Sequence, residues 1–172
     1  VQNTVGKLWL QNRPNSRLRE HMPYFIDSPS LHAADFLKVK GPEDLTLLDS
    51  ACGSGHILVY GFELFTKIYE EEGYTPADIP KLIIEHNLFG FEIDERAAQL
   101  AGFALLMKAR SYHRRFLRAP VKPTILCYRD VVFTPTELAK ALNVSAGAAR
   151  VRLHRAMGRL RVAYYKQESN HA

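Results

Sequence analysis

The sequence predicts an α/β protein with a doubly wound parallel sheet, followed by a small helical appendage. Short apolar runs alternate with longer stretches of helical period, in the order strand, helix, helix, strand, helix, strand. A glycine-rich turn joins the first apolar run to the helix that follows it. The formal net charge of +5 is uneven: residues 1–130 hold 16 basic and 16 acidic side chains, and residues 131–172 hold 7 and 2. We therefore expect two domains, residues 1–133 and a basic tail at 134–172.

Composition excludes several classes of protein. With 172 residues, of which 47% are hydrophobic, the chain can bury a core without disulfide bonds. No apolar run approaches the roughly 18 residues that predict a membrane span, and no signal peptide is visible. The seven histidines lack the spacing of a zinc site, so we expect no metal. Two cysteines, Cys52 and Cys127, make no disulfide framework and favour a cytoplasmic location.

The first elements follow from proline, apolar runs and helical period. Residues 1–40 are expected to be irregular apart from a short amphipathic piece at 7–10, because prolines interrupt them. Residues 45–49 (LTLLD) suit a buried parallel strand. A helix is expected from residue 56 to about 71, and the glutamates at 70–72 are expected to form its solvated end.

The later elements continue the alternation. Thr75-Pro76 is expected to cap a second helix that reaches Asn87. Residues 88–94 (LFGFEID) are the next strand, and a long helix spans 95 to about 115. The cations at 113–115 are expected to complete the carboxyl end of that helix, with nucleic-acid contact as the alternative. Residues 124–127 (TILC) form the third strand.

The most informative motif lies between the first strand and its helix. Open α/β sheets bind ligands at the carboxyl ends of their strands, where Asp49 and the glycine loop lie. Gly53 and Gly55 permit unusual backbone angles and a close ligand approach. The loop lacks the third glycine of the dinucleotide motif, because Leu58 stands there. Asp49 would repel a phosphate but accept hydrogen bonds from an amine.

Acidic residues also end the other two strands. Glu92 can accept hydrogen bonds from both hydroxyls of a ribose, and Ile93 offers an apolar flank to an adenine ring. Asp130 either accepts from an adenine amino group or is a turn residue. Cys52, inside the glycine loop, is expected to fill a small buried space. Together with Asp49, these groups describe a site for S-adenosylmethionine.

These motifs resemble a known family. Residues 49–58 (DSACGSGHIL) are similar to motif I of class I methyltransferases, in the form found in adenine-specific DNA methyltransferases. Residues 90–96 (GFEIDER) and 125–131 (ILCYRDV) are similar to motifs II and III. The intervening sequence, including WLQNRPNSRLREHMPYFIDS, resembles the large adenine methyltransferase of bacterial phage-exclusion (BREX) systems. That family is related to type I and type IIG restriction–modification methyltransferases, and the resemblance covers residues 1–133.

The resemblance implies a partial, Rossmann-like methyltransferase fold and a methyl transfer from S-adenosylmethionine to N6 of an adenine flipped out of duplex DNA. The residues carried over to the cofactor are Asp49, Ala51, Cys52, Gly53, Gly55, Glu92, Ile93 and Asp130. The family's catalytic Asn-Pro-Pro-Tyr motif is absent from the 172 residues, so we assign no catalytic residue. We expect a truncated cofactor-binding portion that is inactive alone, with double-stranded DNA and other phage-defence proteins as partners.

The basic tail predicts two helices joined by a tight turn. One helix runs from Pro135 to Leu142, Asn143 takes the left-handed position, and Ser145 caps the second helix. The segment resembles the promoter-reading helix-turn-helix of bacterial sigma factors. That resemblance makes four side chains candidates for DNA contact: Arg150, Arg152, Arg155 and Arg159. The alternative is an arginine-rich helix that packs on the sheet.

A second function class therefore stays open. The chain would then be a DNA-binding, transcription-regulatory module that uses its helix-turn-helix, and the α/β part would be only a scaffold.

Overall fold

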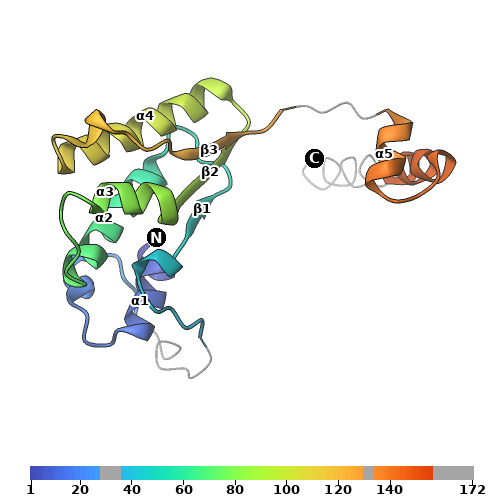
Figure 1. The fold of residues 1–172 in the computed structure, drawn as a ribbon. Coiled ribbons are helices and arrows are strands. Elements are labelled where there is room, and N and C mark those ends of the chain that lie inside the picture. The colour runs from blue at the N-terminus through green and yellow to red at the C-terminus, as the bar shows by residue number, and fades with distance from the viewer. Residues whose placement is uncertain (28–35, 130–133, 157–172) are drawn as a thin grey trace, which may run out of the picture. The chain divides into compact units, whose positions relative to one another are not determined.

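Three parallel strands form the sheet of this protein. The structure, a computed structural model, describes residues 1–27, 36–129 and 134–156, and the chain divides into two compact units, 1–129 and 130–172. In the first unit β1 (Leu47–Asp49), β2 (Leu88–Glu92) and β3 (Thr124–Cys127) pair in the order β1-β2-β3 (Figure 1). Asp49 lies opposite Gly90, and Glu92 lies opposite Cys127. The predicted parallel α/β arrangement is confirmed for these strands.

The long helices pack on one face of this sheet. A β-carbon on Gly61 of α2 (His56–Glu71) would meet the side chains of Leu47 and Leu88. The helix after β2 is α4 (Glu95–Tyr112). Its Lys108 forms an ion pair with Glu63 of α2, and its Tyr112 hydroxyl donates to Glu70 of α2. On the other face Leu48 and Leu126 are 52% and 56% exposed. Helices on both faces, as in a doubly wound sheet, therefore stay an expectation.

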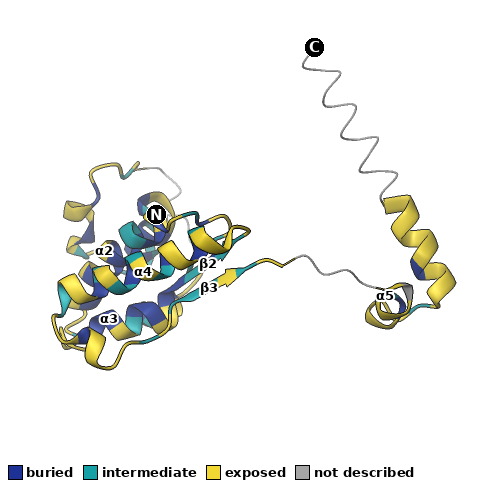
Figure 2. Cartoon of the chain, turned by 90° about the horizontal axis from the view of Figure 1, so that it is seen from above, coloured by how far each residue is buried: buried dark blue, intermediate teal, exposed yellow. Residues whose placement is uncertain are grey.

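The core lies between the helices and the sheet, where the buried residues gather (Figure 2). Asn87, which ends the helical turns α3 (Ile79–Leu82) and 83–87, is completely buried there. Its Nδ2 donates to the carbonyls of Pro42 (2.8 Å) and Leu45 (2.7 Å), and its Oδ1 accepts from the Tyr69 hydroxyl (2.9 Å). Burial is the main cause that raises the pKa of the Tyr69 hydroxyl above its ordinary value. This network fixes the chain that enters β1 against α2.

The N-terminal segment is more ordered than its sequence predicts. A π-helical turn (Gln2–Gly6) leads into α1 (Lys7–Asn12), and a 3-10 helix follows at Arg17–His21. The helical stretch is therefore longer than the expected 7–10. It is stable because its apolar side chains enter the core of the first unit, where Trp9, Leu10, Leu18 and Met22 are buried.

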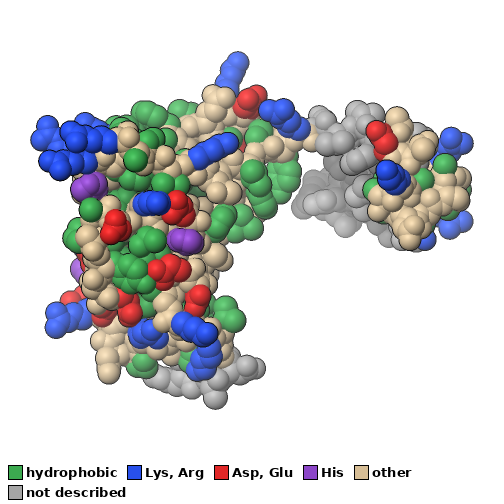
Figure 3. Space-filling model, viewed as in Figure 1, with side chains coloured by type: hydrophobic (Ala, Val, Ile, Leu, Met, Phe, Trp, Pro, Cys, Tyr) green, Lys and Arg blue, Asp and Glu red, His purple; other side chains and the backbone are tan. Residues whose placement is uncertain are grey.

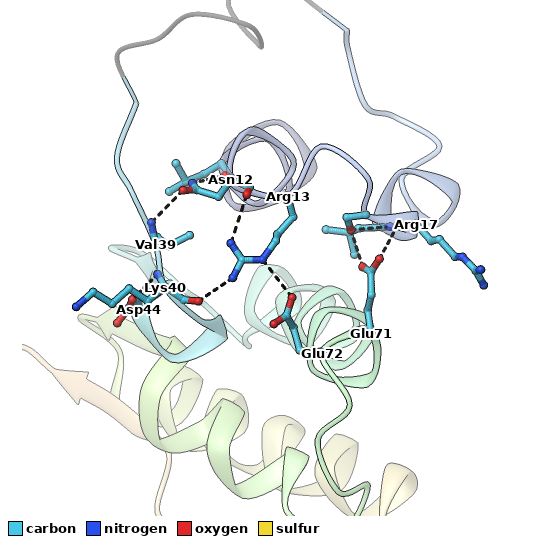
Figure 4. Close-up of polar contacts among 11 residues, drawn as sticks. Asn12, Arg13, Arg17, Val39, Lys40, Asp44, Glu71 and Glu72 are labelled. Carbon is cyan, nitrogen blue, oxygen red and sulfur yellow. Dashed lines mark hydrogen bonds and ion pairs between the residues drawn. The ribbon is translucent and has the colours of Figure 1, made fainter.

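The carboxyl end of α2 holds this segment in place (Figure 4). Glu71 accepts hydrogen bonds from the Ser16 hydroxyl (2.5 Å) and from the backbone N–H of Arg17 (2.7 Å). Glu72 pairs with the Arg13 guanidinium (3.3 Å), which also donates to the carbonyl of Lys40 (2.7 Å). The glutamates at 70–72 are exposed, as expected of a solvated helix end. In addition, the carboxylates of Glu71 and Glu72 bind donors that lie more than fifty residues away in sequence.

Several element boundaries differ from the sequence prediction. β1 begins at Leu47 rather than at residue 45, and α4 ends at Tyr112, before the cations at 113–115 that were expected to complete it. Thr75 opens a turn, in which its carbonyl accepts from Asp78, and α3 begins only at Ile79. β2 ends at Glu92, because the Asp94 carboxylate caps α4 by accepting from the N–H groups of Arg96 (2.7 Å) and Ala97 (3.1 Å). An acidic side chain before a helix thus acts as a cap, and the strand ends two residues earlier than its sequence pattern suggests.

The described part of the second unit, residues 134–156, contains two helices. Thr134 and Glu137 form a capping box at the start of α5 (Pro135–Ala141). Asn143 has a φ of +50°, and the N–H of Val144 donates to the carbonyl of Ala139 (2.9 Å), which closes the helix in a Schellman motif. A further helix starts at residue 146 and runs through residue 156. These helices lie where the sequence predicts them, and their helix-turn-helix role stays a prediction.

Candidate functional site

The glycine loop between β1 and α2 has two glycines with different structural demands. Gly55 has a φ of +86°, and a β-carbon there would lie 3.0 Å from both the Cα and the Cβ of Ala101 on α4. Gly53 has a φ of +53°, but its missing β-carbon would meet nothing within 4 Å. Gly55 therefore allows α4 to approach the loop, whereas Gly53 leaves the backbone open on the solvent side.

Glu92 connects the glycine loop to the end of β2. Its Oε2 accepts from the N–H of Gly53 (2.6 Å), and its Oε1 accepts from the N–H groups of Ile93 (2.8 Å) and Asp94 (3.1 Å). These three hydrogen bonds to the charged form hold the pKa of Glu92 below its ordinary value. The loop and the acidic strand end, distant in sequence, are therefore one site.

Asp49 and Cys52 occupy the inner part of the loop. The half-buried Asp49 carboxylate accepts from the N–H of Ala51 (3.3 Å), and the N–H of Cys52 donates to the carbonyl of Phe91 (2.9 Å). The Cys52 side chain is 6% exposed and lies 3.0 Å from where a β-carbon of Gly90 would be. Burial, followed by the charges of Asp49 and Glu92, raises the pKa of its thiol. Cys52 therefore packs as expected, and its backbone ties the loop to β2.

Gly90 is a site residue that the sequence reasoning missed. A β-carbon there would come within 2.8 Å of Ile125 and 3.1 Å of Leu58, in addition to the Cys52 thiol. A glycine inside a strand often marks a close approach of neighbouring groups, and this was the signal available in the sequence. Because Gly90 has no side chain, Cys52 of the loop can pack directly against β2.

The remaining predicted residues lie at the rim of the site or outside the described ranges. Ile93 is 80% exposed beside Glu92. The ring of Tyr128 lies 5.3 Å from that of Phe91 between centroids, and the Tyr128 N–H donates to the Glu92 carbonyl (2.7 Å). Asp130 and Arg159 fall outside the described residues. In the second unit Arg150, Arg152 and Arg155 are exposed.

Metal clusters and membrane-spanning helices are two other features that the described residues lack. Among residues 1–27, 36–129 and 134–156, no three His, Cys, Asp or Glu side chains gather as a metal site would need. Within the same ranges, none of the helices has the length and apolar character needed to cross a membrane.

Comparison with known proteins points to one group of methyltransferases. The chain is 43% identical over 150 residues to the adenine-specific methyltransferase BrxX of Escherichia coli O9:H4 (strain HS), and the match covers 83% of this chain. It is 36% identical over 151 residues to the adenine-specific methyltransferase PglX of Lacticaseibacillus casei (strain Zhang), over 80% of this chain. The chain is a homologue of one segment of BrxX and PglX. No family model matches it.

The extent of the match with BrxX and PglX matters as much as its strength. The resemblance to the phage-exclusion methyltransferases is confirmed, and the matched part spans 12% of the length of each relative. A match over 80% of the chain is also longer than the first unit of 129 residues, so it extends into the second unit. Homology to BrxX and PglX is therefore not confined to the sheet and its helices.

Proposed function

We propose that the first unit is the S-adenosylmethionine-binding part of an adenine-specific DNA methyltransferase of the BrxX and PglX type. The observation that carries the proposal is the hydrogen bond from the Gly53 N–H to the Glu92 carboxylate. It joins the glycine loop and the acidic strand end, the two halves of the expected cofactor site. The homology to two adenine-specific methyltransferases supports the same conclusion.

The side chains at this edge suit the chemical groups of the cofactor. Asp49 would accept from the ammonium group of the methionine portion. Glu92 uses three of about four acceptor positions for backbone donors, which leaves room for a ribose hydroxyl on Oε2. The exposed Ile93 would pack against the adenine ring, while Ala51, Cys52 and Gly55 shape the loop. Asp130 is proposed to bind the adenine amino group.

The proposal assigns binding, not catalysis, to these residues. When bound, S-adenosylmethionine would supply the methyl group of its positively charged sulfur to N6 of adenine, leaving S-adenosylhomocysteine and releasing one N6 proton. The 172 residues contain no Asn-Pro-Pro-Tyr or Asp-Pro-Pro-Tyr sequence to hold that adenine. We therefore propose that this chain binds the cofactor and does not methylate DNA alone. Double-stranded DNA and other phage-defence proteins would be partners of the complete enzyme.

Calorimetric titration with S-adenosylmethionine tests the cofactor site. The full chain should bind it, and Asp49→Asn should weaken binding by about ten-fold or more, because one charge-assisted contact is worth roughly 1.5–3 kcal/mol. Asp78→Asn removes the same charge from an exposed position on a different element and should leave the affinity unchanged. A correctly folded wild-type chain that binds no cofactor would refute the proposal.

DNA contact by the tail is a separate part of the proposal. It is supported by the exposed Arg150, Arg152 and Arg155 on a helix that follows the left-handed turn at Asn143. Replacing these three arginines by glutamine in the full chain should weaken duplex binding and reduce its salt dependence. Unchanged binding would favour a helix that packs on other protein surface.

A further inference from the structure

A strongly basic surface lies at the carboxyl end of α4, on the first unit. Residues 96–129 contain eight lysines and arginines and no aspartate or glutamate. Figure 3 shows Lys and Arg side chains gathered over this end of the helix. We call the group of Arg110, Arg114, Arg115 and Arg118 the α4-end surface. All four residues are exposed.

The charge of the α4-end surface is not neutralised by neighbouring carboxylates. Within the part of the chain that the structure describes, none of its four arginines forms an ion pair. The nearby acidic groups of α2 are already engaged: Glu63 pairs with Lys108, and Glu70 binds Lys67 and the Tyr112 hydroxyl. The surface therefore carries an uncompensated positive charge.

The helix dipole does not account for these arginines. Cations are favoured within the last turn of a helix, and the effect falls off beyond it. Only Arg110 lies in the last turn of α4, whereas Arg114, Arg115 and Arg118 follow the helix end at Tyr112. Interaction with the dipole of α4 would thus explain the position of Arg110 and of none of the other three arginines.

The arginines beyond α4 are carried on an ordered backbone. The N–H of Phe116 donates to the carbonyl of His113 (2.9 Å), and that of Arg118 donates to the carbonyl of Arg115 (3.0 Å). Phe116, between two of the arginines, is buried in the core of the first unit. Because the segment is already ordered, little backbone entropy is lost when a ligand binds there.

We propose that the α4-end surface binds the phosphate backbone of duplex DNA. Guanidinium groups match phosphate oxygens bidentately, and backbone contacts of this kind carry no sequence information. The 18 residues of α4 separate the surface from the Glu92 edge by about 27 Å, so it is not part of the cofactor site. This proposal rests on the proposed function and adds to it a second contact with DNA, distinct from the tail. Its test does not depend on whether the chain binds the cofactor.

The experiment compares two triple variants of the full chain that lose the same charge. Arg114→Gln/Arg115→Gln/Arg118→Gln removes three charges from the surface, and the control replaces three exposed cations elsewhere: Arg17→Gln/Lys38→Gln/Lys40→Gln. Fluorescence anisotropy with a duplex of about 20 base pairs measures affinity between about 50 and 200 mM salt. We expect the surface variant to bind about ten-fold or more weakly, with a salt slope reduced by roughly 2–3, at about 0.9 per phosphate contact.

The control should bind within about two-fold of wild type, and the triple Arg→Lys variant should keep most of the salt slope because it keeps the charge. Circular dichroism melting checks that each variant is folded. If the triple glutamine variant is not, the single variant Arg118→Gln keeps the test informative, because the loss of one phosphate contact should lower the salt slope by about 0.9. Equal losses in the surface variant and the control, or no loss in either, would overturn the proposal. So would tighter binding to a poly-glutamate peptide of equal charge, which would indicate an acidic protein partner.

Discussion

The two glycines of the loop should respond very differently to the same substitution. Gly55→Ala places a methyl group 3.0 Å from the backbone of Ala101, which cannot rotate away as a flexible side chain would. Gly53→Ala places the same group in open space. Both positions have positive φ, so both variants carry the strain of an alanine in the left-handed region. The difference between them therefore isolates the close approach of α4.

The expected free energies follow from these geometries. Left-handed backbone costs alanine about 1–2 kcal/mol, and the reduced freedom of the unfolded chain offsets roughly 0.4–1 kcal/mol of that. Gly53→Ala should thus lower the free energy of unfolding by about 1 kcal/mol. Overpacking adds about 1–3 kcal/mol, so Gly55→Ala should lower it by about 2–4 kcal/mol. Ala101→Gly should restore only part of the Gly55→Ala loss, because it removes the methyl group of residue 101 and leaves its backbone in place.

Urea unfolding followed by circular dichroism measures both free energies, and calorimetry then measures the cofactor affinity of each folded variant. Gly53→Ala should weaken S-adenosylmethionine binding by about ten-fold while the fold is kept, because the methyl group enters the space proposed for the ligand. If Gly53→Ala destabilises the protein as much as Gly55→Ala, the close approach of Ala101 adds no cost to a methyl group at residue 55, and this explanation of Gly55 is refuted. If it leaves cofactor affinity unchanged, the ligand does not approach Gly53.

Three further predictions concern stability measured by urea unfolding. Asn87→Leu should lower the free energy of unfolding by about 3–5 kcal/mol, because two carbonyls and the Tyr69 hydroxyl lose their hydrogen-bond partner. Tyr69→Phe removes only one of these hydrogen bonds and should lower the free energy of unfolding by about 1 kcal/mol. Glu71→Gln should cost about 1 kcal/mol by weakening the hydrogen bonds with Ser16 and Arg17, and a loss below the error would contradict this. The pKa of Glu92 is lowered on folding, so its stabilising effect is present above the ordinary value of 4.5 and is lost as pH falls through the folded value. Glu92→Gln should remove that part of the pH dependence, and identical profiles would contradict it.

Much of this fold could be predicted from local sequence signals, and the failures have a common physical cause. The order of elements along the chain, the start of α2 after the glycine loop and the left-handed Asn143 each depend on residues close in sequence. The roles of Glu71 and Asn87 depend on partners that only the folded chain brings near. Thr75-Pro76 has the local chemistry of a helix start, but the chain makes a turn there first. Local sequence patterns therefore predicted where helices and strands form. They did not predict the hydrogen bonds by which Glu71 and Asn87 connect elements that are distant in sequence.

The candidate site shows the same division. Glu92 was singled out because it ends a strand beside the glycine loop, and the structure gives it three backbone partners that no pattern revealed. A substitution of Glu92 therefore disturbs the loop as well as any ribose contact, and weak cofactor binding by such a variant has two explanations. Asp49 accepts one long hydrogen bond, at 3.3 Å, from within the loop, so Asp49→Asn disturbs the backbone less. It is the sharper test of cofactor recognition.

The distribution of charge argues against treating the first unit as electrically neutral. Residues 1–95 hold eight basic and fifteen acidic side chains, and residues 96–129 hold eight basic and none acidic. The balanced total arises because two oppositely charged segments cancel. In water with salt, charges farther apart than about 8–10 Å are largely screened from each other, so a polyanion meets the local surface rather than the sum. The excess of positive over negative side chains thus lies in two segments of this protein, the tail and the segment that carries the α4-end surface. Only the first of these is visible in the net charge of the sequence.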